Sequence, residues 1–363
     1  YITGLTESAP SAHNVDYYSN IVKDKSMLRN IVKVAQNMTD EVYENQDEVN
    51  EILDKAEQTL FNLSQDSEKN KFQKLNPILT EVLDSWGNRK TGALTGVGSG
   101  FHDLDNLLTG FQKSDLIILA GRPSMGKTAL ALNFARNAAL NSKCKIGFFS
   151  LEMSSKQLVE RLLTSEAKVD SHAVRTGKLP KHDWPKLSDA ASSLSDSGIY
   201  IDDSADLNIM ELRAKARHLK SEHDIDILFI DYIQLLNAST RMESRQQEIS
   251  FISRSLKALA KELDIPIVSL SQLSRAVESR TDHRPIMSDL RESGAIEQDA
   301  DVVLFIYRKH VYSKEEEDRG LGEIIVAKHR NGPTGVVKVS FVDKYARFNN
   351  LESVHSEYPS LPT

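Results

Sequence analysis

Eight residues near the middle of the chain have the types and spacing of a phosphate-binding loop. The run fits G-x-x-x-x-G-K-[ST] and consists of Gly121, Arg122, Pro123, Ser124, Met125, Gly126, Lys127 and Thr128. In such a loop the backbone N–H groups turn toward phosphate oxygens, and the following helix adds a favourable dipole. Lys127 is expected to reach the β- and γ-phosphates and the Thr128 hydroxyl to coordinate Mg²⁺. The alternative is a chance glycine-rich turn.

Three further polar residues follow apolar runs, where a parallel sheet would bind the same ligand. Asp231 ends the run 225–230 and is expected to hold the metal through water; the alternative is a turn or cap residue. Glu152 follows the run 145–150 and is expected to orient the attacking water, unless it is a glutamate in the first turn of a helix. Gln272 follows 266–271 as a sensor of the γ-phosphate or as a polar strand end.

These residues need a parallel sheet to bring them together. Short apolar runs, typical of strands covered on both faces, occur at 116–120, 145–150, 198–201, 225–230, 266–271 and 302–307. Helical patterns follow the phosphate loop at 129–139 and recur at 245–263. Residues 322–327 and 336–341 flank the turn residues 331–335 and predict an antiparallel hairpin. We therefore expect an α/β domain over 96–352 that ends in a β-hairpin, with a flexible tail at 353–363.

The first 95 residues have a different pattern. Residues 14–36 and 47–63 predict two helices that are too small to form a domain alone. Because the chain does not begin with methionine, we expect 1–63 to be the last part of an all-α domain that begins upstream. A linker is predicted over 64–95, with a helix at 76–86 that Asn76 would cap and Pro77 would begin. The apolar face of this helix could pack on its own domain or dock on a neighbouring subunit.

Composition excludes several classes of protein. Hydrophobic residues make up 40% of the 363 residues, and no apolar run is long enough to cross a bilayer. There is no secretory signal, and the single cysteine, Cys144, excludes an internal disulfide and a cysteine-based zinc site, so a cytoplasmic location is expected. The net charge of −7 argues against a protein that coats nucleic acid. Residues 1–75 hold 13 acidic and 8 basic side chains, so nucleic-acid contact must come from local basic loops elsewhere.

Six runs together resemble the hexameric replicative DNA helicases of bacteria, the DnaB type. They are Gly121–Thr128, Phe149–Met153, Ile230–Gln234, Ser269–Arg275, Asp289–Gly294 and Lys328–Pro333. One run alone would carry little weight, but the six occur in order, and the resemblance covers nearly all of 74–352. It implies a RecA-like P-loop NTPase core behind a partial N-terminal helical domain. It also implies that the linker helix at 76–86 docks on an adjacent protomer.

The resemblance implies roles for single residues. Glu152 is the expected catalytic base, Asp231 the acid that supports the metal and Gln272 the residue that couples hydrolysis to movement. Lys328 and Arg330 match paired basic residues that reach into the neighbouring subunit's ATP site. There, positive charge would stabilise the transferring phosphoryl group. Composition alone would favour an ordinary solvated hairpin tip at this position.

A DNA contact is also implied. Arg291, Glu292 and Gly294 match the loop that lines the central channel in this family. A basic side chain beside a glycine can present charge and backbone N–H groups to a phosphate. The basic segment 275–284 is a second candidate loop. Neither loop has interleaved aromatic residues, so contact with the DNA backbone is expected rather than base stacking.

The prediction is therefore an ATP-dependent 5′–3′ DNA helicase. It would be a homohexameric ring that uses ATP and Mg²⁺ to move on single-stranded DNA and unwind the duplex at the replication fork. The family adds primase and a helicase loader as partners, and the bacterial cytoplasm, at the nucleoid, as location; no membrane is involved. Two other classes stay open. A RecA-like recombination or repair ATPase would lack the helix at 76–86, and an ATP-gated interaction module without motor activity would not need Glu152, Lys328 and Arg330.

Overall fold

The structure is a computed structural model that describes residues 15–44, 59, 75–87, 94–238, 242–290 and 294–351. The chain divides into two compact units, Tyr1–Thr91 and Gly92–Thr363. Among the described residues no helix combines the length and the apolar character needed to cross a membrane. The predicted helix at 47–63, apart from Thr59, and the predicted tail at 353–363 lie outside the described residues.

Two helices make up most of the described part of the first unit. α2, Val15–Glu44, runs past the predicted end at 36, because no glycine or proline interrupts residues 37–44. α4, Leu75–Gly87, begins one residue before Asn76. The expected cap at Asn76 is therefore wrong: Asn76 lies in the first turn, where its carbonyl accepts a hydrogen bond from the Thr80 hydroxyl at 3.2 Å. The exposed residues of α4 include the apolar side chains of Leu75, Leu79, Leu83 and Trp86.

The second unit is built on one sheet with the strand order β3-β2-β4-β5-β1-β6-β7-β8-β9. The strands from β3 to β6 pair in parallel, and β7, β8 and β9 continue the sheet in antiparallel pairing. All six predicted strands and the predicted hairpin are confirmed; β9 was not predicted. The bounds are β1 Leu116–Gly121, β2 Ile146–Ser150, β3 Ile199–Asp202, β4 Ile227–Asp231, β5 Ile267–Gln272, β6 Val302–Tyr307, β7 Leu321–His329, β8 Gly335–Val342 and β9 Arg347–Asn350.

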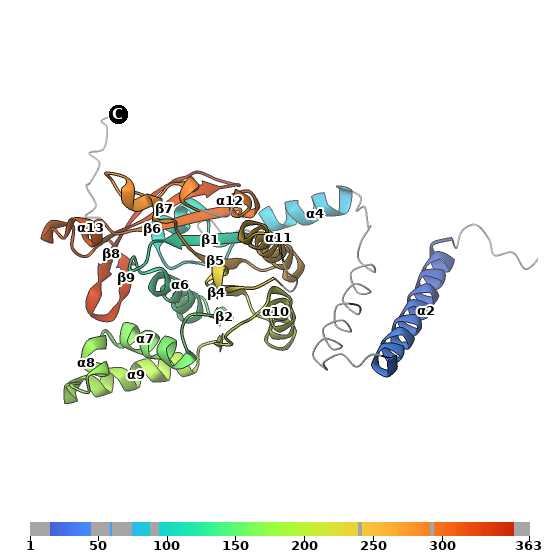
Figure 1. Cartoon of the computed structure of the whole chain (residues 1–363), viewed down its shortest axis with the longest axis horizontal. Coiled ribbons are helices and arrows are strands. Elements are labelled where there is room, and N and C mark those ends of the chain that lie inside the picture. The colour runs from blue at the N-terminus through green and yellow to red at the C-terminus, as the bar shows by residue number, and fades with distance from the viewer. Residues whose placement is uncertain are drawn as a thin grey trace, which may run out of the picture. The chain divides into compact units, whose positions relative to one another are not determined.

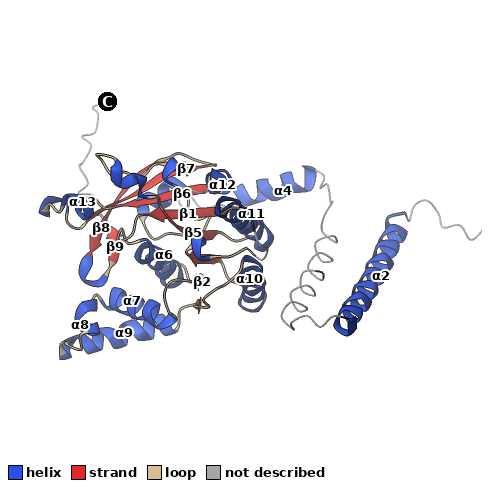
Figure 2. Cartoon of the chain, viewed as in Figure 1, coloured by secondary structure: helices blue, strands red, loops and turns tan. Residues whose placement is uncertain are grey.

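Helices cover both faces of the sheet (Figure 2). Side chains alternate along a strand, so Ile117 and Leu119 of β1 join one buried cluster with α6, while Leu116 and Ile118 join another with α10 and α11. This is the RecA-like arrangement. The helices are α5 His102–Leu108, α6 Lys127–Asn141, α7 Ser155–Ala167, α8 Ser171–Arg175, α9 Trp184–Ser195, α10 Ile209–His223, α11 Arg245–Leu263, α12 Gly294–Asp299 and α13 His310–Ser313.

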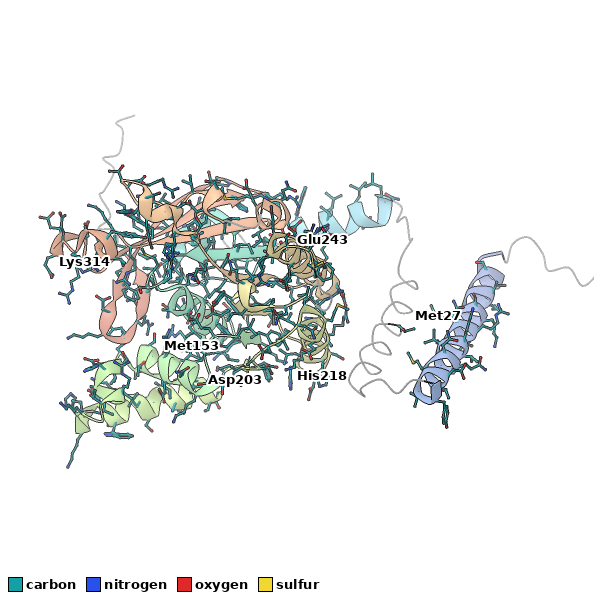
Figure 3. All side chains as sticks on the ribbon, in the orientation of Figure 1. Met27, Met153, Asp203, His218, Glu243 and Lys314 are labelled. Carbon is teal, nitrogen blue, oxygen red and sulfur yellow. The ribbon has the colours of Figure 1, made fainter. Side chains whose placement is uncertain are left out.

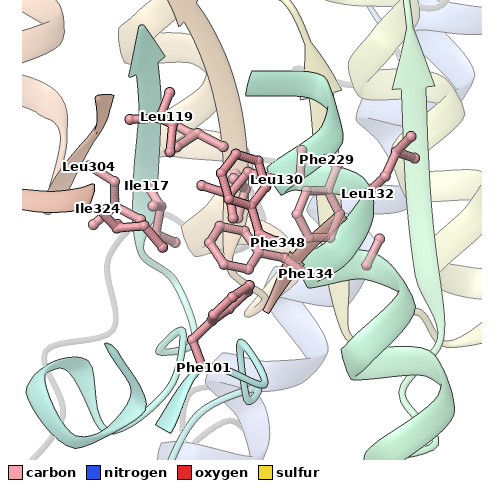
Figure 4. Packing of buried hydrophobic residues seen from close by; sticks show 14 of the residues in the cluster. Phe101, Ile117, Leu119, Leu130, Leu132, Phe134, Phe229, Leu304, Ile324 and Phe348 are labelled. Atoms are coloured by element: carbon pink, nitrogen blue, oxygen red, sulfur yellow. The ribbon is translucent and has the colours of Figure 1, made fainter. Parts of the chain in front are cut away.

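Aromatic packing fixes the helix that follows the phosphate loop. The ring of Phe134 on α6 packs edge-to-face with that of Phe101, at 5.6 Å between ring centroids (Figure 4). It packs in the same way with the ring of Phe111, at 5.3 Å. All three rings are buried, and such edge-to-face pairs add to the free energy gained by burial. α6 also shares this buried cluster with Ile117 and Leu119 of β1, and its first residues, Lys127 and Thr128, come directly after the loop at the carboxyl end of that strand.

A smaller layer of helices lies beside this core. α7 packs through Leu158 and Leu162 on the main cluster, while Ala167, Val169 and Ala190 form a separate small cluster among α7, α8 and α9 (Figure 1). The first residue of α7 is tied to the residue after β3, because the N–H of Ser155 donates to Asp203 at 2.7 Å. Asp203 and Met153 lie on this side of the unit (Figure 3). These elements form one wall of the site described next.

Candidate nucleotide-binding site

The register of the sheet brings four strand ends side by side. Gly121 at the end of β1 is paired with Gln272 of β5, and Ser150 at the end of β2 is paired with Asp231 of β4. β4 and β5 are themselves neighbours. The phosphate loop and the polar residues at the ends of the neighbouring strands therefore share the carboxyl edge of the sheet, where α/β proteins bind their ligands.

Two residues of the phosphate loop, Ser124 and Gly126, have a positive φ. Gly126, which precedes the first residue of α6, has φ of +96°, and a Cβ there would lie 3.1 Å from the ring of Phe348. Glycine is therefore required at this position. Met125 is buried in the core and does not line the cleft. Ser124 also has a positive φ, of 66°, so the loop is held in a tight turn.

Lys127 points back across this loop. Its Nζ donates to the Gly121 carbonyl at 3.1 Å. Burial lowers the pKa of Lys127, while the carboxylates of Asp231 and Glu152 act in the opposite direction. An ammonium group that has lost part of its hydration attracts a phosphate strongly, because the negative charge of the phosphate is screened less than it would be in water.

Thr128 and Asp231 form the part of the site that suits a magnesium ion. The Thr128 hydroxyl donates to Asp231 Oδ2 at 2.7 Å, and Asp231 Oδ1 is buried with no hydrogen-bond partner. Burial raises the pKa of Asp231, and the bond from Thr128 partly offsets that effect. The unpartnered oxygen beside a hydroxyl fits Mg²⁺, which prefers oxygen ligands and keeps several waters. Since the described residues contain no cluster of three acidic, histidine or cysteine ligands, water and phosphate oxygens would have to complete the coordination.

Glu152 lies in the loop between β2 and α7, and its side chain is exposed. α7 begins at Ser155 behind Ser154, which forms a capping box with Gln157. Glu152 is thus not in the first turn of a helix, and that alternative is wrong. The loop is fastened on both sides: the Leu151 N–H donates to the Asp231 carbonyl at 2.8 Å, and the Ser150 hydroxyl donates to the Met153 carbonyl at 2.6 Å.

Gln272 is held by a residue that had no role in the sequence-based prediction. Gln234 accepts a hydrogen bond from the Gln272 N–H at 3.2 Å and donates to the Ser271 hydroxyl at 2.9 Å. The side chain of Gln234 therefore spans from the segment after β4 to the end of β5. Gln234 belongs to the run Ile230–Gln234, which carries part of the family resemblance. Its contact with β5 could not be predicted from that run, because it depends on β4 and β5 being neighbours in the sheet.

A cleft of about 590 Å³ runs along this edge. Its walls include Glu152, Gln272 and most of the phosphate loop: Arg122, Pro123, Ser124, Gly126, Lys127 and Thr128. The sequence did not predict a second group of lining residues, which comprises Arg161, His172, Arg175, Arg308 and Tyr345. Arg308 is buried, stacks 3.7 Å from the centroid of the Phe341 ring and pairs with Asp343 at 2.8 Å.

Lys328 and Arg330 lie at the opposite end of the parallel strands, where β6 begins. His329, between them, is paired with Val302, the first residue of β6. Lys328 Nζ donates to the carbonyls of Glu297 at 2.6 Å and Ala300 at 2.7 Å, and Arg330 Nη1 lies 3.2 Å from Asp301 Oδ1. β6 and β1 run in parallel with Val302 opposite Ile117, so about 13 Å of strand separates Val302 from the level of Gly121, where the phosphate loop begins. Neither side chain belongs to the cleft of its own subunit.

A buried carboxylate anchors Arg330. Asp301 accepts the Leu116 N–H at 2.9 Å and also pairs with Lys257. Asp115 lies next to this network, and burial together with the charge of Asp301 raises its pKa to about 6. The unfolded chain binds the Asp115 proton less tightly than the folded chain, so this group favours folding more as the pH falls from about 6 toward 4.

Replacing Asp115 with asparagine should therefore stabilise the protein at high pH. We expect the free energy of unfolding at pH 8 to rise by about 1–2 kcal/mol, since the buried charge is lost. The gain should shrink as the pH falls through about 6 and vanish near 4, where Asp115 is protonated in the folded protein and is as neutral as the asparagine that replaces it. Urea unfolding of both proteins across this pH range measures it. An equal gain at pH 8 and pH 4.5 would contradict the assigned cause.

Of the residues predicted to contact DNA, Arg291 and Glu292 lie outside the described residues, and Gly294 begins α12. In the second candidate loop, Arg280 forms an ion pair with Asp289 and Arg284 with Glu323. Those two charges are thus neutralised within the fold.

Known proteins similar to this chain are replicative DNA helicases. Residues 96–350 match the DnaB-like helicase C terminal domain. The replicative DNA helicase DnaB of Geobacillus stearothermophilus is 47% identical over 355 residues, 97% of this chain and 78% of that protein. The replicative DNA helicase DnaC of Bacillus subtilis (strain 168) is 48% identical over 356 residues, 97% of this chain and 78% of that protein.

Two solved structures have the same fold. One is an ATPase domain that is 40% identical with a TM-score of 0.75, over 78% of this chain and 100% of that one. The other is a DnaB-like replicative helicase, solved in a study of its interactions with primase. It is 35% identical with a TM-score of 0.81, over 97% of this chain and 83% of that one. The chain belongs to the DnaB-like family of replicative DNA helicases, which are ATP-dependent enzymes.

Proposed function

We propose that this helicase works as a closed homohexameric ring in which each ATP is hydrolysed between two subunits. One observation carries the proposal: Lys328 and Arg330 lie at the sheet edge opposite their own phosphate loop. They can act on a phosphate only if it belongs to a neighbour. Repeated head-to-tail contacts of this kind close into a ring when the rotation between subunits allows it.

The chemistry follows from the placement of the side chains. Glu152 orients the attacking water and accepts its proton, and Lys127 with the loop N–H groups holds the phosphate oxygens. Thr128 and Asp231 would hold Mg²⁺, whose positive charge would offset the negative charge of the phosphates. Arg330 of the neighbouring subunit stabilises the charge of the transferring phosphoryl group, and Lys328 supports it. Gln272, in line with Gly121, senses the γ-phosphate.

Movement on DNA requires contacts outside this cleft. Arg291, Glu292 and Gly294 face single-stranded DNA in the ring channel, and translocation runs 5′ to 3′. The exposed apolar residues of α4 supply the surface with which a linker within 64–95 docks on an adjacent protomer. Residues 1–63 then belong to an N-terminal helical domain, and 96–352 form the motor.

The partners follow from the family. One solved relative was studied with primase, and we extend primase binding to this chain together with a helicase loader. We place the ring at the replication fork, on the nucleoid in the bacterial cytoplasm.

The test combines particle mass, ATPase rate and unwinding. We expect a hexamer whose ATPase is stimulated by single-stranded DNA and which unwinds a forked duplex bearing a free 5′ tail on the strand it binds. A fork that offers only a 3′ tail should not be opened. Open filaments would instead indicate a recombinase, and an ATPase that ignores DNA would indicate an interaction module.

A further inference from the structure

The guanidinium of Arg122, inside the phosphate loop, is bound to the segment that follows β5. Its Nε and Nη2 donate to Glu278 Oε1 at 3.0 and 2.6 Å, and its Nη1 donates to the Leu273 carbonyl at 2.8 Å. The Arg122 side chain is 11% exposed, whereas that of Glu278 is 48% exposed. Both contacts join the ATP site to a separate segment of the chain.

That segment is braced at its far end as well. Ser274, next to Leu273, donates its N–H to the Asp289 carbonyl at 2.9 Å. The buried Asp289 carboxylate accepts the Ile286 N–H at 2.7 Å and forms an ion pair with Arg280. Residues 273–290 therefore form one hydrogen-bonded unit that starts at the phosphate loop. It ends at Leu290, directly before Arg291, a residue that the proposed function assigns to DNA.

We propose that Glu278 is a positioning residue that couples the two sites: through Arg122 it ties the shape of the phosphate loop to the segment 273–290. Nucleotide bound to the loop then changes how DNA is held, and DNA changes how fast ATP is hydrolysed. For binding, such coupling is reciprocal, so that nucleotide and DNA change each other's affinity by the same factor, whereas the effect on the hydrolysis rate need not be symmetric. The inference rests on the proposed function, because it takes DNA to bind beyond Leu290.

The exposure of Glu278 makes the coupling separable from folding. A half-exposed ion pair contributes little to stability, because water screens it. Glu278 also does not line the cleft of its own subunit. Its removal should thus leave both the fold and the chemistry in place.

The experiment compares Glu278→Gln with wild type as full-length rings. We measure the ATPase rate without DNA and at saturating single-stranded oligonucleotide, together with the KM for ATP and the melting temperature. The ratio of stimulated to basal rate should fall by about fivefold or more, a factor within the range typical of coupled sites. The basal rate and the melting temperature should stay near those of wild type. Glu278→Asp, which keeps the charge, should recover part of the ratio.

Glu317→Gln is the matched control. Glu317 is an exposed glutamate with no ion pair among the described residues, and it should change nothing. An unchanged ratio in Glu278→Gln would overturn the inference. Equal loss of basal and stimulated rates would also overturn it, by showing a purely structural role. If wild type itself ignores DNA, the proposed function fails and this inference falls with it.

Discussion

Replacing Arg330 with alanine is expected to lower the maximal rate of ATP hydrolysis by about a thousandfold or more, as when an arginine finger is removed. The guanidinium stabilises charge that exists only during phosphoryl transfer, so the loss should appear in kcat. The affinity for ATP should change little, since that charge has not yet developed when ATP is bound. Steady-state ATPase assays and equilibrium binding of a fluorescent ATP analogue measure the two quantities.

Arg319→Ala is the control for this variant. Its side chain is 59% exposed against 56% for Arg330, and its ion pair partner, Glu316, is also exposed. It should hydrolyse ATP normally. An Arg330→Ala protein with normal turnover would refute the trans-acting role. A loss of hexamers in this variant would leave an assembly defect as the cause, so the particle mass must accompany the rates.

Glu152→Gln is expected to reduce kcat by about 10²- to 10⁴-fold, the usual contribution of a general base. Glutamine keeps the shape of the side chain but cannot accept the proton from the attacking water. The loop that carries Glu152 is fastened to β4 by the Leu151 N–H, so the substitution should not disturb the fold. ATP should still bind, and the ring should remain intact. Single-turnover hydrolysis separates the chemical step from product release.

Glu160→Gln provides the comparison for Glu152. Glu160 lines the same cleft from α7 and is likewise exposed. A change there alters the charge of the cleft without removing the proposed base, and we expect a less than tenfold effect. If both variants lose activity to the same extent, the loss comes from the reduced negative charge of the cleft, and Glu152 is not the general base.

Much of the motor fold was predictable because its strands are buried on both faces. The strand β4 reads as a continuous apolar run that ends in Asp231, and α11 was predicted with its exact bounds. Ser244 caps that helix and Asp264 ends it with a positive φ, so local signals agree with the apolar periodicity. β9 was missed because only Phe348 of its four residues is buried. Its pairing with β8 depends on the whole sheet.

The site was predictable where one short run carries the chemistry. The loop from Gly121 to Thr128 has a fixed spacing, because phosphate binding constrains each backbone position. Arg161 and Arg175 had no such signal, since an arginine on a helix surface looks the same whether it faces solvent or a cleft. The ion pair of Arg122 with Glu278 links residues 156 positions apart. Such contacts follow from the strand order and not from local pattern.

The most direct measurement mixes two inactive proteins. Glu152→Gln subunits keep Arg330 but have no working site, whereas Arg330→Ala subunits keep Glu152 but provide no finger. In randomly mixed rings, about a quarter of the interfaces join an intact site to an intact finger. We expect subunit exchange to restore ATPase activity, with a maximum near equal amounts of the two variants. If the mixture is no more active than the sum of its parts, Arg330 does not act on its neighbour's ATP.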